Sequence, residues 1–209
     1  SKSRPDTVVS PETVVARQGA DALRCYEMFI GPFDQEVQWS EQGLAGVHRF
    51  LNRAWEVVTQ GRAPNGQTGG SDDSALRRMV HKTIMRVTTD LDRLHFNTMI
   101  AALMEYVNYL QTARSQDISD AAWNEAIEAL LLMLAPSAPH MAEELWQRLG
   151  RPYSIHQQAW PTFDPALIAE DQVTLVVQIG GKVRDKLTVP ADISEAEAKA
   201  LALGSERIK

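Results

Sequence analysis

Residues 40–58 read SEQGLAGVHRFLNRAWEVV, and this stretch decides the fold class. Its large apolar residues recur at steps of three and four from Leu44 to Val58, which is the period of a helix with one buried face. Polar residues such as Arg49 and Glu56 fall on the other side. The pattern predicts one amphipathic helix of about five turns. Such a helix needs other helices to cover its apolar face.

Further helical patterns lie on both sides of this stretch. Upstream, Ser10 is a candidate N-cap before a helix that stops at Gly19, and a second helix is expected from Asp21 to about Pro32. Downstream, a glycine-rich loop at 61–71 is followed by apolar stripes of helical period, with a break at two prolines and an end at a glycine: 76–94, 96–110, 123–134, Pro136, Pro139 and Gly150. Residues from about 40 to 150 therefore predict an antiparallel helix bundle.

After Pro161 the apolar period changes from 3.6 to 2. Apolar residues alternate along 173–179 and again along 183–189, and the Gly180-Gly181 pair between them suits a type I′ turn. Ser194 and Glu197 then have the spacing of a capping box, which predicts a helix to about Leu203. The fold class is thus mainly α, a helix bundle with a small C-terminal β-hairpin plus helix.

Composition excludes several classes of protein. The 209 residues carry 21 basic and 27 acidic side chains, a net charge of −6 that argues against a protein that coats polyanions with its whole surface. A single cysteine excludes an intramolecular disulfide, and neither a secretory signal nor a membrane span is evident, so we expect a cytoplasmic protein with no membrane partner. The chain starts without methionine, and both ends give the expectation of a piece cut from a longer protein.

The charges are unevenly distributed. Residues 77–93 hold five cations against two acids, a net charge of +3, whereas residues 117–149 hold six acids against one arginine, a net charge of −5. Arg78, Lys82 and Arg86 are spaced i, i+4 and i+8, so they share one helix face. Such a stripe is either a solvated face or a surface that contacts RNA.

A second group of cations lies on and just after the predicted hairpin turn, at Lys182, Arg184 and Lys186. These residues could contact phosphates, but strand alternation alone does not separate that role from an ordinary exposed face.

Catalytic and metal-binding motifs are absent from the sequence. The five histidines are scattered, no metal-ligand spacing occurs, and no phosphate-binding glycine loop or nucleophile elbow is found. We expect Cys25 to be a small buried thiol, His140 to cap or pack at a helix start, and the five tryptophans to pack in the core. The residues thus predict no metal site and no self-contained active site.

Several segments resemble class I aminoacyl-tRNA synthetases. Ser1-Lys2-Ser3-Arg4 is similar to the end of their Lys-Met-Ser-Lys-Ser signature, whose Lys and Met would lie just before residue 1. Other segments resemble the bacterial type of leucyl-tRNA synthetase in particular: Tyr26–Gln35, Trp39–Gly43, Arg49–Trp55, Phe96–Thr98, Leu134–Trp146 and Val177–Arg184. The resemblance covers nearly the whole chain except 61–71. One small departure is Gly-Gly at the hairpin turn, where the family more often has Asn-Gly.

The resemblance implies a domain plan and a reaction. It divides the chain into a signature-loop remnant with connecting helices at 1–39, a class I anticodon-binding-type bundle that grips tRNA at 40–165, and the start of a truncated α/β domain at 170–209. The parent enzyme would use ATP with Mg²⁺ to make leucyl-adenylate and transfer leucine to tRNA(Leu). Its nucleotide-binding fold, leucine pocket and editing domain are absent from these residues. The chain alone is therefore expected to be inactive, without a cofactor, and monomeric.

Roles for individual residues also follow from the resemblance. Lys2 would stabilise charge on the ATP phosphates, and Ser1 and Ser3 would shape its loop. Candidates for tRNA contact are Arg78, Lys82, Arg86, Lys182 and Arg184. Two alternatives stay open at this point: a valyl- or isoleucyl-type synthetase fragment, and a free-standing helical module that binds protein, which the acidic stretch at 117–149 favours.

Overall fold

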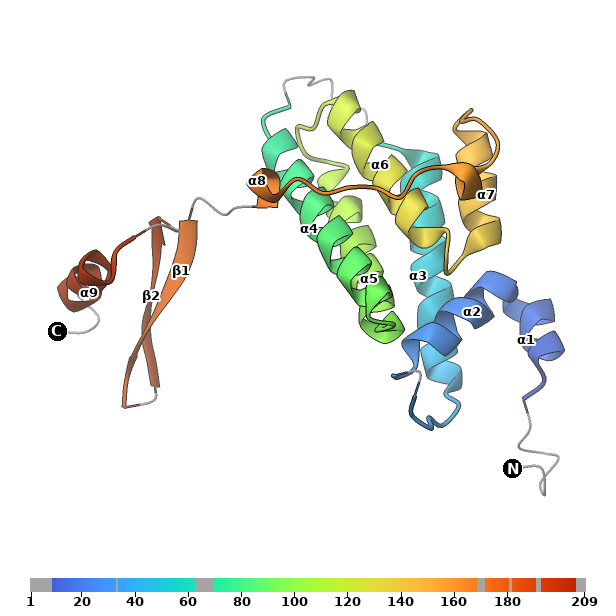
Figure 1. Cartoon of the computed structure of the whole chain (residues 1–209), viewed down its shortest axis with the longest axis horizontal. Helices are drawn as coiled ribbons and strands as arrows, with labels where there is room; N and C mark the ends of the chain where they lie inside the picture. The colour runs from blue at the N-terminus through green and yellow to red at the C-terminus, as the bar shows by residue number, and fades with distance from the viewer. Residues whose placement is uncertain are drawn as a thin grey trace. The chain divides into compact units, whose positions relative to one another are not determined.

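A computed structural model describes residues 9–32, 34–62, 70–168, 172–180, 182–190 and 193–205. The chain divides into two compact units, Ser1–Leu167 and Ile168–Lys209. Each unit is described by itself below, with the elements labelled as in Figure 1.

The first unit is built from helices (Figure 1). In chain order they are α1 (Pro11–Gln18), α2 (Ala20–Phe29), α3 (Glu41–Gln60), α4 (Asp73–Asp92), α5 (Phe96–Ala113), α6 (Asp120–Leu134), α7 (Pro139–Arg148), a 3-10 turn η2 (Ile155–Gln157) and α8 (Pro165–Ile168). The predicted helices are all present. The one from Asp21 is shorter than expected and ends at Phe29 rather than near Pro32.

Local signals in the sequence set several helix ends. Gly19 has a φ of +88°, which a residue with a side chain rarely adopts, so the chain changes direction there between α1 and α2. Ser40 and Ser119 accept N–H groups of the first turns of α3 and α6. Ser10 behaves differently from the prediction. It holds the N-cap position of α1, but its hydroxyl donates to the Glu12 carboxylate instead of accepting a backbone N–H.

Helix α5 lies at the centre of the first unit and contacts α2, α3, α4 and α6. Its Tyr106 is fully buried, as is Phe50 on α3. The predicted core role of the tryptophans is confirmed for Trp123 and Trp146, which are buried, while the other three are partly exposed and pack against the edge of the core. Cys25 is completely buried, as expected.

The second unit is a hairpin followed by a helix. Strand β1 (Gln172–Ile179) pairs antiparallel with β2 (Lys182–Pro190), and α9 (Glu195–Gly204) follows. Gly180 has a φ of +59°, as a type I′ turn requires. The predicted capping box is present, with Ser194 and Glu197 each accepting the other's backbone N–H.

Candidate nucleic-acid interface

The predicted basic stripe lies on the outer side of α4. The residues of α4 that are buried against α5 and α6 include Leu76, Val80 and Val87, and helical geometry turns Arg78 and Lys82 toward the opposite side. Lys82 and Arg86 are exposed, and Arg78 is half-buried. The i, i+4, i+8 spacing therefore does bring the three cations onto one side of the helix.

Two ion pairs with neighbouring helices offset part of the positive charge of α4. Arg86 forms an ion pair with Glu105 of α5, with 2.6 Å between Nη1 and Oε2. Arg77 turns toward α6 and meets Glu125 at 3.0 Å. Part of the +3 charge counted along the sequence is thus used to join α4 to its neighbours, and Arg86 is not an isolated cation.

The acidic stretch at 117–149 is likewise engaged inside the first unit. Each of its six acids has a basic side chain or a backbone N–H as partner. The pairs are Asp117 with the N–H of Ser71 at 3.2 Å, Asp120 with Arg62 at 3.2 Å, Glu125 with Arg77, Glu128 with Arg151 at 2.7 Å, Glu143 with the N–H of Ile155 at 3.0 Å, and Glu144 with Arg148 at 2.7 Å. The net charge of −5 therefore overstates how much unpaired negative charge this stretch presents.

The hairpin cations are exposed, but a β-bulge divides them. Val177 pairs with Asp185 and Gln178 with Val183, so Arg184 is the extra residue on β2. Simple alternation would place Lys182, Arg184 and Lys186 on one face. With one residue inserted, Lys182 and Lys186 fall on opposite faces of the hairpin. Lys182 and Arg184 remain next to the turn and accessible to solvent.

The residues that the resemblance assigns to the ATP loop, Ser1, Lys2 and Ser3, lie outside the described residues. Within the described part of the chain, no three histidine, cysteine or carboxylate side chains gather as a metal site would require. No helix there is long and apolar enough to cross a membrane.

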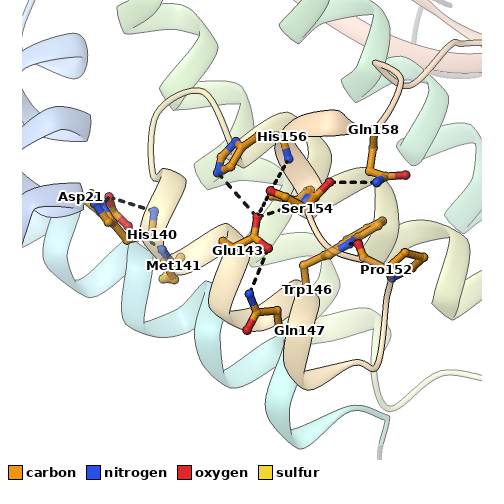
Figure 2. A network of polar contacts seen from close by, with 11 residues as sticks. Asp21, His140, Met141, Glu143, Trp146, Gln147, Pro152, Ser154, His156 and Gln158 are labelled. Atoms are coloured by element: carbon orange, nitrogen blue, oxygen red, sulfur yellow. Dashed lines mark hydrogen bonds and ion pairs between the residues drawn. The ribbon is translucent and has the colours of Figure 1, made fainter.

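A polar network around α7 was missed by sequence reasoning (Figure 2). Asp21 of α2 reaches the start of α7, where its carboxylate meets the ring Nδ1 of His140 at 2.8 Å and the backbone N–H of Met141 at 2.7 Å. His140 thus lies at the helix start as predicted, but its ring is exposed and the capping group is Asp21. Only the acidic character of Asp21 was visible in the sequence, because its partners are 119 and 120 positions away.

The other end of the network fixes the segment that follows α7. Glu143 accepts from the hydroxyl of Ser154 and the N–H of Ile155, and Trp146 donates its indole N–H to the carbonyl of Pro152 at 2.8 Å (Figure 2). The Ser154 hydroxyl is the main reason why the pKa of Glu143 is below its usual value. These contacts hold residues 152–155 against α7 and give the polar groups of Glu143 and Trp146 hydrogen-bond partners.

Comparison with known proteins agrees with this arrangement. The whole chain is 48% identical to a leucine–tRNA ligase of Dehalococcoides mccartyi strain BAV1 and 46% identical to one of Rubrobacter xylanophilus, of which it covers 26% and 25%. The chain thus spans about a quarter of the length of these curated relatives. It also resembles the agnB2 LeuRS of Agrobacterium radiobacter K84, solved in a ternary complex with tRNA and LeuAMS. The TM-score is 0.82 and the identity 29%, covering all of this chain and 28% of that one.

The family model described as the anticodon-binding domain of tRNA ligase matches residues 73–200. This match takes in the basic helix α4, the central helix α5 and both strands of the hairpin. Since it includes more than half of the residues, the chain belongs to the family of anticodon-binding domains of tRNA ligases.

Proposed function

We propose that this chain is the tRNA-binding part of a leucine–tRNA ligase. The observation that carries the proposal is the full-length structural match, with a TM-score of 0.82, to a LeuRS that was solved together with tRNA. The identity of 42–48% over the whole chain to proteins named leucine–tRNA ligase supports the leucine type over the valyl and isoleucyl alternatives. The proposed partner is tRNA(Leu).

The whole ligase would join leucine to its tRNA through leucyl-adenylate, with ATP converted to AMP and pyrophosphate. The described residues offer no fit for ATP or Mg²⁺, because they bring together no phosphate-binding loop and no cluster of metal ligands. Only Lys2, with Ser1 and Ser3, is proposed to contact ATP from this chain. The proposed contribution of the described residues is therefore to bind and position RNA.

The cations of α4 and of the hairpin are the proposed RNA-binding residues. Phosphate contacts need accessible cations and no particular base sequence, and Lys82, Arg86, Lys182 and Arg184 are all exposed. Recognition of a folded RNA by its shape and backbone suits a few cations at separate places on the surface. Arg78, half-buried on the same side of α4, is proposed to support this contact.

The rival interpretation, a helical module that binds protein, loses its main support. It rested on the acidic stretch at 117–149, whose six acids all have partners within the chain. An acidic surface whose carboxylates already have partners offers less attraction to a basic protein, because a new ion pair would have to compete with an existing ion pair or hydrogen bond.

Binding of a tRNA(Leu) transcript to the purified chain, measured by fluorescence anisotropy over a range of salt concentrations, tests the proposal. We expect Lys82→Glu/Arg86→Glu to weaken binding about tenfold or more and to reduce the salt dependence by roughly two counterions. Arg17→Glu/Arg49→Glu is the matched control, since both residues are exposed, lie on α1 and α3, and give the same charge change. Equal weakening by both double variants would show that net charge alone drives binding and would reject α4 as the interface.

A further inference from the structure

The last part of the first unit crosses the helix bundle as a strap, defined here as residues 159–167. It follows η2 and runs along α6 and α4 to the boundary of the second unit (Figure 1). Two hydrogen bonds tie it to α4. The indole N–H of Trp160 donates to the hydroxyl oxygen of Thr88 at 2.8 Å, and the backbone N–H of Asp164 donates to Nδ1 of His81 at 2.9 Å. The strap is therefore held at two points about two turns of α4 apart.

The strap is not packed tightly onto the helices beneath it. A cavity of about 560 Å³ lies between α4, α6 and residues 159–162, with Val80, Ile84 and Leu132 among its apolar lining. Trp160 packs against the edge of the core, whereas Asp164 is exposed and its hydrogen bond to His81 ties that part of the strap to α4.

The contact with Asp164 requires an unprotonated Nδ1 on His81. A backbone N–H can only donate, so Nδ1 must offer its lone pair and the ring proton must be on Nε2. Nε2 lies 3.4 Å from Oε1 of Glu125. A carboxylate oxygen accepts hydrogen bonds, so Nε2 is the ring nitrogen that should carry the proton. One neutral tautomer therefore satisfies both sides of the ring, which is only 13% exposed.

We propose that His81 is a positioning residue whose protonation releases the strap at Asp164. A protonated ring carries hydrogens on both nitrogens, so Nδ1–H would face the N–H of Asp164 and the hydrogen bond would be lost. The charged groups around the ring are Glu125 of α6, Arg77 of α4 on the same carboxylate, and Glu128 on the wall of the cavity, while the Asp164 carboxylate accepts the N–H of Ala166. Glu125 can accept from Nε2 in either form of the ring, whereas the backbone N–H of Asp164 can donate only to the neutral form.

After release, the strap would still be hydrogen-bonded to α4 through Trp160 and Thr88. His81 would thus set, according to pH, whether the strap is tied to α4 at Asp164. The inference does not require that the chain binds tRNA.

Amide hydrogen exchange of Asp164, measured by NMR on the full chain and corrected for the intrinsic exchange rate at each pH, tests the proposal. Histidine side chains ordinarily titrate between about pH 5 and pH 8. We expect protection of the Asp164 amide to fall about fivefold to tenfold between about pH 8 and pH 5, the worth of one hydrogen bond. The fall should have the same midpoint as the titration of the His81 ring, followed by its own ring resonances.

Three variants distinguish loss of the hydrogen bond between His81 and Asp164 from a general loosening of the strap. In His81→Asn the side-chain oxygen takes the place of Nδ1 and does not titrate, so Asp164 should stay protected at both pH values. In His81→Leu the acceptor is gone, and Asp164 should be unprotected at both. Thr88→Val removes only the Trp160 bond, so the pH response of Asp164 should remain.

Wild-type protection that is the same at both pH values, or that falls with a midpoint different from that of the His81 ring, would overturn the proposal. Neither outcome depends on whether the variants fold. A fall in His81→Asn equal to that of the wild type would also overturn it, because that side chain has no proton to gain in this range.

Discussion

The carboxylate of Asp21 caps α7 from another helix, by accepting the backbone N–H of Met141 at 2.7 Å. Helix α7 cannot be capped locally, because its N-cap residue Ala138 has no side-chain acceptor and its first residue is Pro139. The Asp21 carboxylate instead lies at the positive end of the helix, where it also receives the N–H of His140 at 3.4 Å. The cap therefore fixes α2 against α7 as well as completing the first turn.

Removal of this cap should destabilise the chain measurably. We expect Asp21→Ala to lower the free energy of unfolding by about 1–2 kcal/mol, as for other N-cap losses. Asp21→Asn keeps an oxygen that can accept the N–H of Met141, so it should lose less than half as much. Urea unfolding followed by circular dichroism gives both values. Equal losses for the two variants would mean that the charge, and not the hydrogen bond, supplies the stability.

The parts of the fold that the sequence predicts are those with local causes. The glycine at 19 and the capping box at 194–197 act on residues within four positions, so these helix edges can be predicted directly. The hairpin follows from alternation and two glycines. The shared side of Arg78, Lys82 and Arg86 follows from spacing alone.

What the sequence does not predict depends on residues brought together by packing. Asp21 with α7, Glu105 with Arg86, and Asp164 with His81 are each pairs from different elements, and nothing near any of these residues indicates its partner. The bulge at Arg184 is similar, because strand alternation continues through it in the sequence while the pairing shifts by one. The ion-pair partner of Arg86, for example, is visible only in the structure.

A pH dependence of stability is expected from Asp73 at the start of α4. Its carboxylate accepts from the hydroxyl of Ser119 at 2.5 Å and from the N–H of Ser119 at 2.7 Å. The hydroxyl is the main cause of a lowered pKa of Asp73, so the carboxylate stabilises the fold above its unfolded-state pKa and loses this effect as the pH falls through its native pKa.

The variant Asp73→Asn should accordingly be less stable than the wild type at about pH 7 and approach it at about pH 3. Unfolding midpoints in urea, measured for both proteins across this range, give the difference at each pH. A difference that stays constant with pH would show that protonation of Asp73 is not linked to folding.

The single cysteine should be unreactive in the folded chain. Burial raises the pKa of Cys25 to about 12, so the thiolate at pH 8 is roughly a thousandfold scarcer than for a thiol at its ordinary value. We expect almost no labelling by a thiol-specific disulfide reagent in the native state and one thiol per chain in denaturant. Because Cys25 is the only cysteine, rapid native labelling would show directly that the helix α2 region opens easily.

Release of Arg86 from its ion pair should strengthen RNA binding. In Glu105→Gln the guanidinium loses the negative charge that it meets at 2.6 Å, so it can bind a phosphate at lower cost and we expect tRNA affinity to rise about threefold. Because this pair is largely exposed, stability should change by less than about 0.5 kcal/mol. Glu128→Gln is the matched control, since it removes the same charge but frees Arg151, which is not on α4. If both variants raise the affinity equally, Arg86 makes no specific contact, and the proposed interface would have to rest on Lys82 and the hairpin alone.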